Sequence, residues 1–376
     1  MTRLFVDVHV LQTVPPSNIN RDDTGSPKSA VYGGVPRARV SSQAWKRATR
    51  QMFRDLLDPA TLGVRTKRVV ELVAERIHTV AADLDQPETL ATQVLKDAGI
   101  KLEKPKRGKK DDTFGDEPEQ SGYLLFLSAS QIARLATLAI ESARTGTPID
   151  KSAARAAAQG DNSIDVALFG RMVADSADLN IDAAAQVAHA ISVHAVNNEF
   201  DYFTAVDDRA PENNAGAGML GYVEFNSSTL YRYATVNTAM LRENLGDDTA
   251  TVNAVTTFLT AFVKSMPTGK QNTFANRTLP EAVLISLRTD QPVNLVGAFE
   301  EPVNAAGAAR AIGAAKALVA RLQNVEHAYG DGSTENLVIA AGDAVGELTS
   351  LGEPLRFSAA IEQVAAKVRS ALGGPA

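Results

Sequence analysis

The chain opens with a run of alternating apolar and polar residues. From Leu4 to Leu11 every second side chain is a leucine or a valine, which predicts a strand with one apolar face. The pair Pro15–Pro16 is expected to end this strand, and a polar loop follows it. A second short extended segment, Arg37–Val40, then leads into Ser41 and Ser42, which can cap a helix.

The segment that follows, up to about Leu57, has the period of an amphipathic helix. Apolar residues recur every three or four positions between Trp45 and Leu56 and form one stripe. The opposite face has no acidic residue before Asp55, whereas helix faces in solvent usually mix the two charges. That face is either an ordinary solvated surface or a surface for a polyanion, and the pattern leaves both open. It carries Gln43, Lys46, Arg47, Arg50 and Arg54.

The rest of the chain predicts a mixture of helices and antiparallel strands. An alanine-rich, mostly helical insertion is expected from about Asp58 to Ile181, with a strand over Ser163–Met172 inside it. We expect an α+β fold in which helices cover one face of an antiparallel sheet. Outside the insertion, helices are expected over Asp182–Ile191 and Thr249–Met266, strands over Leu230–Val236 and Glu281–Leu287, and further helices in the alanine-rich C-terminal part.

A segment rich in aromatic residues lies between two of these elements. Phe200, Tyr202 and Phe203 occur within four residues, and a glycine-containing stretch leads back to Tyr222–Phe225. An outward strand and a return strand predict a protruding hairpin. From the sequence alone, burial in the core is the simpler interpretation of Tyr202 and Phe203.

The composition excludes several classes of protein. The 376 residues are 44% hydrophobic and 22% charged, so the chain can bury a sizeable core. No cysteine is present, which excludes a disulfide scaffold, a thiolate metal site and a cysteine nucleophile. No run of about 18 apolar residues could span a membrane. We therefore expect a soluble, cytoplasmic protein with no membrane partner.

The charge of the chain is unevenly distributed. The net charge is −6, yet residues 1–54 contain nine basic and three acidic residues, or +6, which leaves −12 for the remainder. A site for a polyanion needs a local basic face rather than a basic total. The N-terminal part is therefore the candidate region for binding nucleic acid.

The sequence lacks the common catalytic patterns. It has no Walker loop, no dinucleotide-binding glycine fingerprint, no zincin motif and no Gly-x-Ser-x-Gly elbow. His189 and His194 are five residues apart, which does not suit one helix face, and we interpret them as structural. The pair Asp22–Asp23 could hold a divalent metal at a phosphodiester, but turn-forming residues are the simpler interpretation. No catalytic residue, metal or cofactor is therefore assigned.

Several blocks of the sequence occur in the order of a known family. They are Val8-His9-Val10-Leu11, Asn20-Arg21-Asp22-Asp23, Gly33-Gly34, Arg39-Val40-Ser41-Ser42-Gln43-x-x-Lys46-Arg47-Ala48-x-Arg50, Asp165–Met172, Ala188-His189-Ala190-Ile191, Asp201–Asp208, Leu230–Ala234, Leu241–Gly246 and Gly269-Lys270-Gln271. Together these blocks strongly resemble the backbone subunit of Cascade, the type I-E CRISPR surveillance complex (the CasC family of the RAMP superfamily).

This resemblance implies a fold like an open right hand. The palm would be a modified RNA-recognition-motif (ferredoxin-like) domain made of residues 1–58, 184–196 and 226–376. The fingers would be the mainly helical insertion, residues 59–183. The thumb would be the protruding hairpin, residues 197–225.

The resemblance also implies a role without catalysis. Several copies, roughly six, would stack head to tail along one CRISPR RNA, as heterologous contacts allow. Each copy would grip the RNA backbone, and its thumb would displace one nucleotide at regular intervals, leaving the others to pair with target DNA in antiviral defence. The implied partners are CRISPR RNA, the target DNA strand, other copies of the chain, the large and small subunits, the subunit that binds the 5′ handle, and the repeat-cleaving endoribonuclease.

The residues that suit these tasks form three groups, and all of them except Lys28 lie within the family blocks. The palm group for RNA is Asn20, Arg21, Lys28, Ser41, Ser42, Gln43, Lys46, Arg47, Arg50, Lys270 and Gln271. The fingers group for RNA or DNA is Arg171 and Met172, and the thumb group is Tyr202, Phe203, Thr204 and Val206.

Two other interpretations remain open at this stage. A related backbone subunit of type III complexes would cut target RNA through a loop aspartate, Asp22 or Asp23, and a divalent metal. An α+β metabolic enzyme could instead use the basic helix to bind a phosphorylated small molecule.

Overall fold

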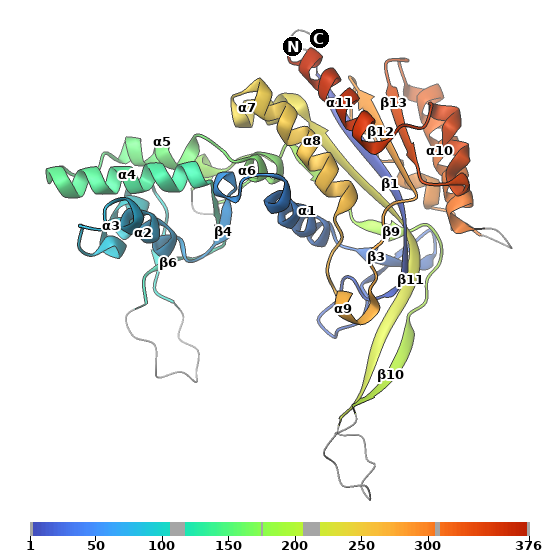
Figure 1. Cartoon of the computed structure of the whole chain (residues 1–376), viewed down its shortest axis with the longest axis horizontal. Coiled ribbons are helices and arrows are strands. Elements are labelled where there is room, and N and C mark those ends of the chain that lie inside the picture. The colour runs from blue at the N-terminus through green and yellow to red at the C-terminus, as the bar shows by residue number, and fades with distance from the viewer. Residues whose placement is uncertain (1–2, 106–116, 174–175, 206–218, 305–308, 374–376) are drawn as a thin grey trace, which may run out of the picture. The chain divides into compact units, whose positions relative to one another are not determined.

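A computed structural model of the whole chain describes residues 3–105, 117–173, 176–205, 219–304 and 309–373. The chain divides into two compact units (Figure 1). The first unit comprises Met1–Phe53, Gln186–Thr238 and Val255–Ala376, and the second comprises Arg54–Ala185 and Ala239–Ala254. None of the helices in the described ranges is long and apolar enough to cross a membrane.

The first unit is built on a nine-stranded sheet. Its strands follow the order β13-β12-β1-β11-β9-β3-β2, and β8 and β10 also pair with β11. The pairings whose register is described in this sheet are antiparallel. The strands are β1 (Phe5–Ser17), β2 (Ser29–Tyr32), β3 (Val35–Val40), β8 (Ala185–Val187), β9 (Ala190–Ser192), β10 (Glu199–Ala205), β11 (Met219–Asn237), β12 (Ala282–Arg288) and β13 (Glu335–Ala340).

The predicted end of the first strand is wrong. β1 continues through Pro15 and Pro16 to Ser17, which pairs with Asn226 of β11. The register shifts between Val14 and Ser17, so the two prolines lie outside the regular ladder. Because proline cannot donate to a ladder, a bulge is where a strand tolerates it.

Helices pack on both faces of the sheet, and the expectation of one covered face is therefore wrong (Figure 1). On one face, α10 (Arg310–Tyr329) packs against Tyr231 and Tyr233 of β11. On the other face, α1 (Ser42–Leu56) packs against Leu230 through Trp45. The side chains of successive strand residues alternate between faces, which explains why neighbouring residues of β11 contact different helices. The remaining helices that lie mainly in this unit are α8 (Asp248–Lys264), α9 (Gln271–Phe274) and α11 (Phe357–Ala371), with 3-10 turns η3 (Leu295–Phe299) and η4 (Asp343–Leu351).

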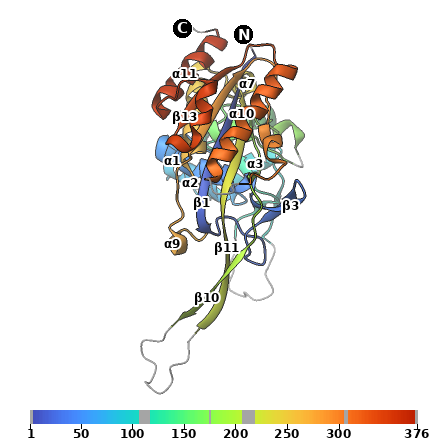
Figure 2. The ribbon, with the colours of Figure 1, turned by 90° about the vertical axis from the view of Figure 1, so that its right-hand side faces the viewer.

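A two-stranded ribbon extends from the sheet. β10 pairs with the first part of β11, from Glu199 opposite Phe225 to Ala205 opposite Met219. Figure 2 shows the two strands running side by side beyond the other strands of this unit. The ribbon has the predicted hairpin topology, and Val206 of the predicted thumb group lies outside the described residues.

The second unit is mostly helical, as the alanine-rich sequence predicts. A buried cluster joins its helices, with Val73, Leu95 and Leu135 fully buried. Its helices are α2 (Val69–Val80), α3 (Pro87–Asp97), α4 (Ala129–Thr145), α5 (Lys151–Gln159), α6 (Ile164–Phe169) and α7 (Thr238–Leu245), with 3-10 turns η1 (Pro59–Thr61) and η2 (Ala177–Leu179) and short strands β4 (Val64–Thr66), β5 (Leu102–Glu103), β6 (Gln120–Ser121) and β7 (Leu125–Leu127).

Two predicted elements have the wrong type. The predicted strand Ser163–Met172 contains helix α6, which ends at Gly170 with a positive φ of 75°. A short apolar run does not distinguish a buried helix from a strand by its period. The predicted helix Asp182–Ile191 contains β8 and the start of β9, because β9 pairs with β11 on one side and β3 on the other. β13 was also predicted as part of a helical region, and its pairing with β12 is equally non-local.

Candidate nucleic-acid interface

The N-terminus of α1 is fastened to the loop that precedes β2. The Ser41 amide donates to Asn20 Oδ1 at 2.8 Å, and Ser41 Oγ accepts from the Ala44 amide at 3.3 Å. Asn20 and Ser41 therefore hold the helix end in place. Helix geometry leaves the amides of Ser42 and Gln43 without acceptors inside the helix, and this end carries the positive pole of the helix dipole.

The outer face of α1 is basic, as predicted. Gln43 and Arg47 are exposed, whereas Lys46 and Arg50 are half-buried. Burial lowers the pKa of Lys46. Because an anion beside an ammonium group favours its charged form, a phosphate on this face would oppose that effect.

The inner face of α1 rests on a buried cation that the sequence analysis did not identify. Arg232 of β11 is 1% exposed, and its guanidinium carbon lies 3.6 Å from the ring centroid of Trp45 and 4.6 Å from that of Phe262. Its guanidinium donates to Gln12 Oε1 at 2.6 Å and to the Phe262 carbonyl. Burial lowers the pKa of Arg232 to about 9. This arrangement joins α1, β1, β11 and α8.

The loop before β2 is shaped by Asp22. Its Oδ1 accepts from the Thr24 amide at 2.9 Å, the Thr24 hydroxyl at 2.8 Å and the Ser26 amide at 3.0 Å. These hydrogen bonds lower the pKa of Asp22. The side chain has the contacts of a turn-forming aspartate. Arg21, next to it, is exposed.

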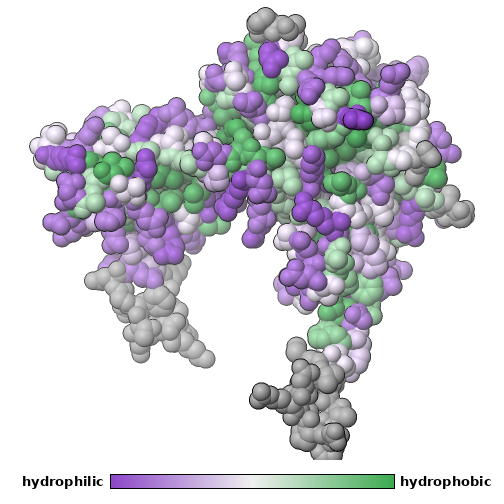
Figure 3. Space-filling model, viewed as in Figure 1, coloured by the Kyte–Doolittle hydropathy of each residue, from purple (hydrophilic) through white to green (hydrophobic). Residues whose placement is uncertain are grey.

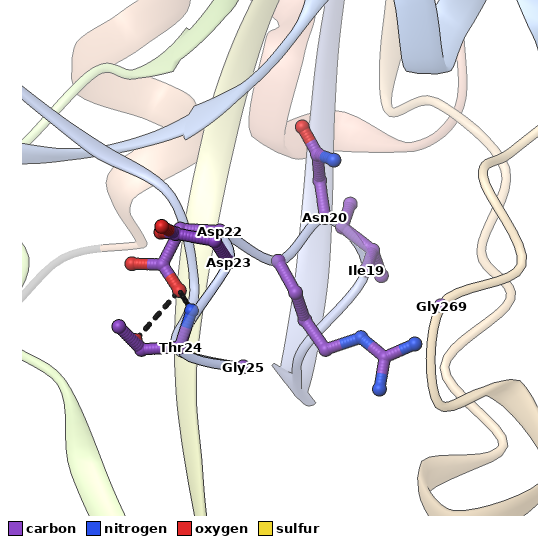
Figure 4. A pocket seen from close by; sticks show the side chains of 8 residues that line it. Ile19, Asn20, Asp22, Asp23, Thr24, Gly25 and Gly269 are labelled. Atoms are coloured by element: carbon purple, nitrogen blue, oxygen red, sulfur yellow. Dashed lines mark hydrogen bonds between the residues drawn. The ribbon is translucent and has the colours of Figure 1, made fainter. Parts of the chain in front are cut away.

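The loop that contains Gly269 packs against this loop. The two loops border an open hollow of about 540 Å³, lined by residues 19–25 and Gly269 (Figure 4). A Cβ atom on Gly269 would lie 2.4 Å from the Ile19 carbonyl oxygen, so only glycine allows this approach. Lys270 follows with a positive φ of 51° as the N-cap of α9 (Gln271–Phe274), and Gln271 is exposed. The fold thus brings Lys270 and Gln271 beside the loop of Asn20 and Arg21.

The ribbon exposes aromatic side chains, contrary to the interpretation that they belong to the core. Phe200, Tyr202 and Tyr222 are 68%, 52% and 75% exposed, and the rings of Tyr202 and Tyr222 are 5.3 Å apart. Figure 3 shows apolar patches along this ribbon. Phe200 and Tyr222 were missed as site residues, although Phe200 shares the two-residue period of Tyr202. Thr204 is exposed beside them.

Phe203 lies on the other face of the ribbon and has a different environment. It pairs with Gly221, and a Cβ atom there would be 2.5 Å from the Phe203 ring. Phe203, which is 36% exposed, therefore covers the glycine backbone of the opposite strand.

The two residues predicted for the fingers differ sharply. Arg171 is 5% exposed and donates to the carbonyls of Leu179, Phe126 and Ala158 and to Gln131 Oε1, at 2.7 to 3.2 Å. Burial lowers the pKa of Arg171 to about 10. This side chain holds the second unit together, whereas Met172 beside it is 80% exposed.

The histidines occupy two kinds of position. His9 is buried in the sheet, and burial lowers its pKa to about 3. His194 is also buried; its Nδ1 lies 2.8 Å from the Ala195 carbonyl, and its Nε2 accepts from the Thr229 amide at 3.2 Å. His189 is exposed and lies against Arg39. Within the ranges that the structure covers, no group of three or more histidine or acidic side chains could hold a metal ion.

The fold and the interface define an α+β protein whose basic loop-and-helix surface suits a phosphate backbone. The chain belongs to the CT1975-like protein family, whose model matches residues 6–363. A solved chain titled "CRISPR RNA-guided surveillance complex, pre-nicking" is 35% identical, with a TM-score of 0.85 over 97% of this chain and 100% of that chain. Another, titled "CRISPR RNA-guided surveillance complex", is 31% identical, with a TM-score of 0.74 over 96% and 99%. No curated protein matches the chain.

Proposed function

We propose that the protein is a non-catalytic backbone subunit of a Cascade-type CRISPR surveillance complex that binds CRISPR RNA. The single observation that carries the proposal is the surface formed by the Asn20–Lys28 loop, the basic face of α1 and the Gly269–Gln271 loop. The likeness to chains of RNA-guided surveillance complexes supports the choice of ligand. We assign the complex to type I-E on the sequence blocks described above.

The chemistry of this surface suits a ligand of variable sequence. The base sequence of a guide RNA differs from one molecule to the next. The affinity of the protein for the guide must therefore come from contacts with phosphates and from the shape of the RNA rather than from base edges. Arg21, Lys46 and Arg50 supply charge, and the amide end of α1 supplies donors for a phosphate. These groups recognise phosphate oxygens and carry no base preference.

The ribbon is the proposed device for displacing nucleotides. A nucleotide forced out of the stack exposes two base faces, which an aromatic side chain can cover. Phe200, Tyr202 and Tyr222 are exposed on one face of the ribbon. They are the side chains that we propose to stack on the displaced bases. The displaced nucleotides would recur along the guide, and the bases between them would remain available to target DNA.

The proposed complex contains several copies of this chain. We propose that residues 1–58, 184–196 and 226–376 act as palm, 59–183 as fingers and 197–225 as thumb. Several copies would line one RNA head to tail, beside the large, small, handle-binding and RNA-cleaving subunits. Met172 of the fingers is the exposed apolar side chain proposed to meet the nucleic acid there.

Charge reversal on the palm tests the proposal. Arg21, Lys46 and Arg50 changed together to Glu should weaken binding of single-stranded RNA at least about a hundredfold, because three phosphate contacts become repulsive. Fluorescence anisotropy with the full chain measures the affinity, and circular dichroism checks the fold.

A matched variant controls for net charge. Arg321, Arg356 and Arg369 are exposed on the same unit, away from the three site elements in sequence, and their reversal to Glu changes the net charge equally. The control should bind RNA nearly as the wild type does. Equal losses in both variants, or tight binding by the palm variant, would refute the proposed interface.

A further inference from the structure

A second group of donors lies beside the proposed interface, and only one of its members was predicted. Lys28 precedes β2, Arg39 lies on β3, and His189 lies in the turn between β8 and β9. Arg39 Nε donates to the Ser29 carbonyl at 3.0 Å, and Arg39 Nη1 lies 3.2 Å from His189 Nδ1. Three separate segments of the first unit thus bring these side chains together.

The contact with Arg39 decides which nitrogen of His189 carries the proton. A guanidinium group is always a donor, so Nδ1 must accept from it. The neutral imidazole then holds its proton on Nε2, which is a donor for a further acceptor. His189 is exposed, so a ligand can reach it.

The surroundings of His189 are positive. Burial lowers the pKa of His189, and the charges of Arg39 and Lys28 lower it further. Among the residues that the structure describes, no carboxylate forms an ion pair with Lys28 or Arg39. In the described part of the chain, two cations and an imidazole donor therefore lie together without an ion-paired carboxylate.

This group adjoins the palm surface rather than standing apart from it. Lys28 and Arg39 line one small hollow together with Asn20, and Asn20 holds the first turn of α1 through Ser41. The Lys28 amide also donates to the Asn20 carbonyl at 2.9 Å. A backbone that leaves the end of α1 can reach this group directly.

We propose that Lys28, Arg39 and His189 form a further phosphate-binding site for the guide RNA, in which His189 Nε2 donates to a phosphate oxygen. The inference rests on the proposed function and extends its interface to His189 and Arg39. A phosphate bound at Nε2 favours the protonated imidazole, in which Nδ1 no longer accepts from Arg39. RNA binding at this site is therefore accompanied by uptake of a proton, and the affinity rises as the pH falls.

Two substitutions of His189 test the site. His189→Ala removes the donor and should weaken binding of a mixed-sequence single-stranded RNA by about tenfold at pH 6, the scale of one charge-assisted hydrogen bond. His189→Gln keeps an amide donor that never titrates. The affinity of His189→Gln for RNA should be close to that of the wild type at pH 8 and lower than that of the wild type at pH 6.

The pH series separates this role from a structural one. Wild-type affinity should rise as the pH falls from 8 to 6, by at most about tenfold per pH unit, since one proton is taken up. Both His189 variants should lose this rise. His327→Ala, on the exposed surface of α10, is the control and should keep it.

Chemical modification gives an independent readout on the full chain. Diethylpyrocarbonate should modify His189 less when RNA is bound, with His78 and His327 as internal references. Unchanged affinity and unchanged modification of His189, in a wild type that binds RNA, would overturn the site and leave the palm proposal intact. A wild type that binds no RNA would overturn both.

Discussion

The buried side chain of Arg232 supports the helix α1, whose opposite face is the basic surface. Its guanidinium lies between Trp45 and Phe262, and its two hydrogen-bond acceptors belong to β1 and α8. A buried cation is costly unless its environment compensates for lost solvent, and aromatic faces provide part of that compensation. The basic face of α1 therefore depends on a charge beneath the helix.

Replacing this cation should loosen α1. Arg232→Met keeps the length of the side chain but leaves Gln12 Oε1 and the Phe262 carbonyl unpaired, so the free energy of unfolding should fall by about 2 kcal/mol. Trp45 is the single tryptophan of the chain, and its emission should shift to longer wavelength as water reaches it. Urea titration and fluorescence measure the two effects.

A surface arginine provides the comparison. Arg242 is 44% exposed and pairs with Asp248, so Arg242→Met should change stability by less than about 0.5 kcal/mol. A stability gain in Arg232→Met, with unchanged emission, would contradict the role given to Arg232.

Single residues also mark where prediction from sequence succeeded and failed. The basic face of α1 was predictable because the helix is amphipathic and its polar side lacks acids. The contact of Arg39 with His189 could not be predicted from the sequence, because 150 residues separate the two and only the pairing of β3 with β9 brings them together. Arg171 stands in a family block, yet its four hydrogen-bond acceptors lie on other elements, which the sequence does not reveal.

At the scale of elements, the two faces of the ribbon give their aromatic side chains different environments. Tyr202 and Tyr222 form an exposed pair on one face, whereas Phe203 covers Gly221 on the other. The two aromatic neighbours should therefore act differently when removed.

Tyr202→Ala should impair capture of target DNA by the assembled complex by about tenfold, because base–aromatic stacking is lost, while loading of the guide changes little. Phe203→Ala should destabilise the ribbon itself and increase its digestion by protease, because Gly221 loses its cover. Binding assays with complementary DNA and limited proteolysis distinguish them. Identical behaviour of the two variants would contradict the division of the faces.

Secondary structure was predictable wherever local periodicity decided it. α1 and α8 begin and end close to their predicted positions, because each has a regular apolar stripe or a long uninterrupted helical run. A helix is predicted over Asp182–Ile191, yet this segment contains β8 and the start of β9, because β11 and β3 offer hydrogen bonds there. Non-local pairing overrides propensity in such short segments.

At the scale of the whole molecule, the charge distribution is the feature most directly tied to the proposed role. The net charge is −6, while the first 54 residues carry +6. Under the proposed function, the acidic remainder would disfavour polyanions elsewhere on the chain, and the basic segment would confine binding to one surface. Binding at this surface should depend on salt rather than on base sequence.

The most direct test of this claim is a salt titration with two RNAs of equal length and unrelated sequence. Contacts from Arg21, Lys28, Arg39, Lys46 and Arg50 predict a slope of log affinity against log salt of about −3.5 for single-stranded RNA. The affinities for the two RNAs should be equal within about twofold. Affinity that hardly depends on salt, or a preference of about tenfold or more for one sequence, would contradict a sequence-independent grip on the phosphate backbone.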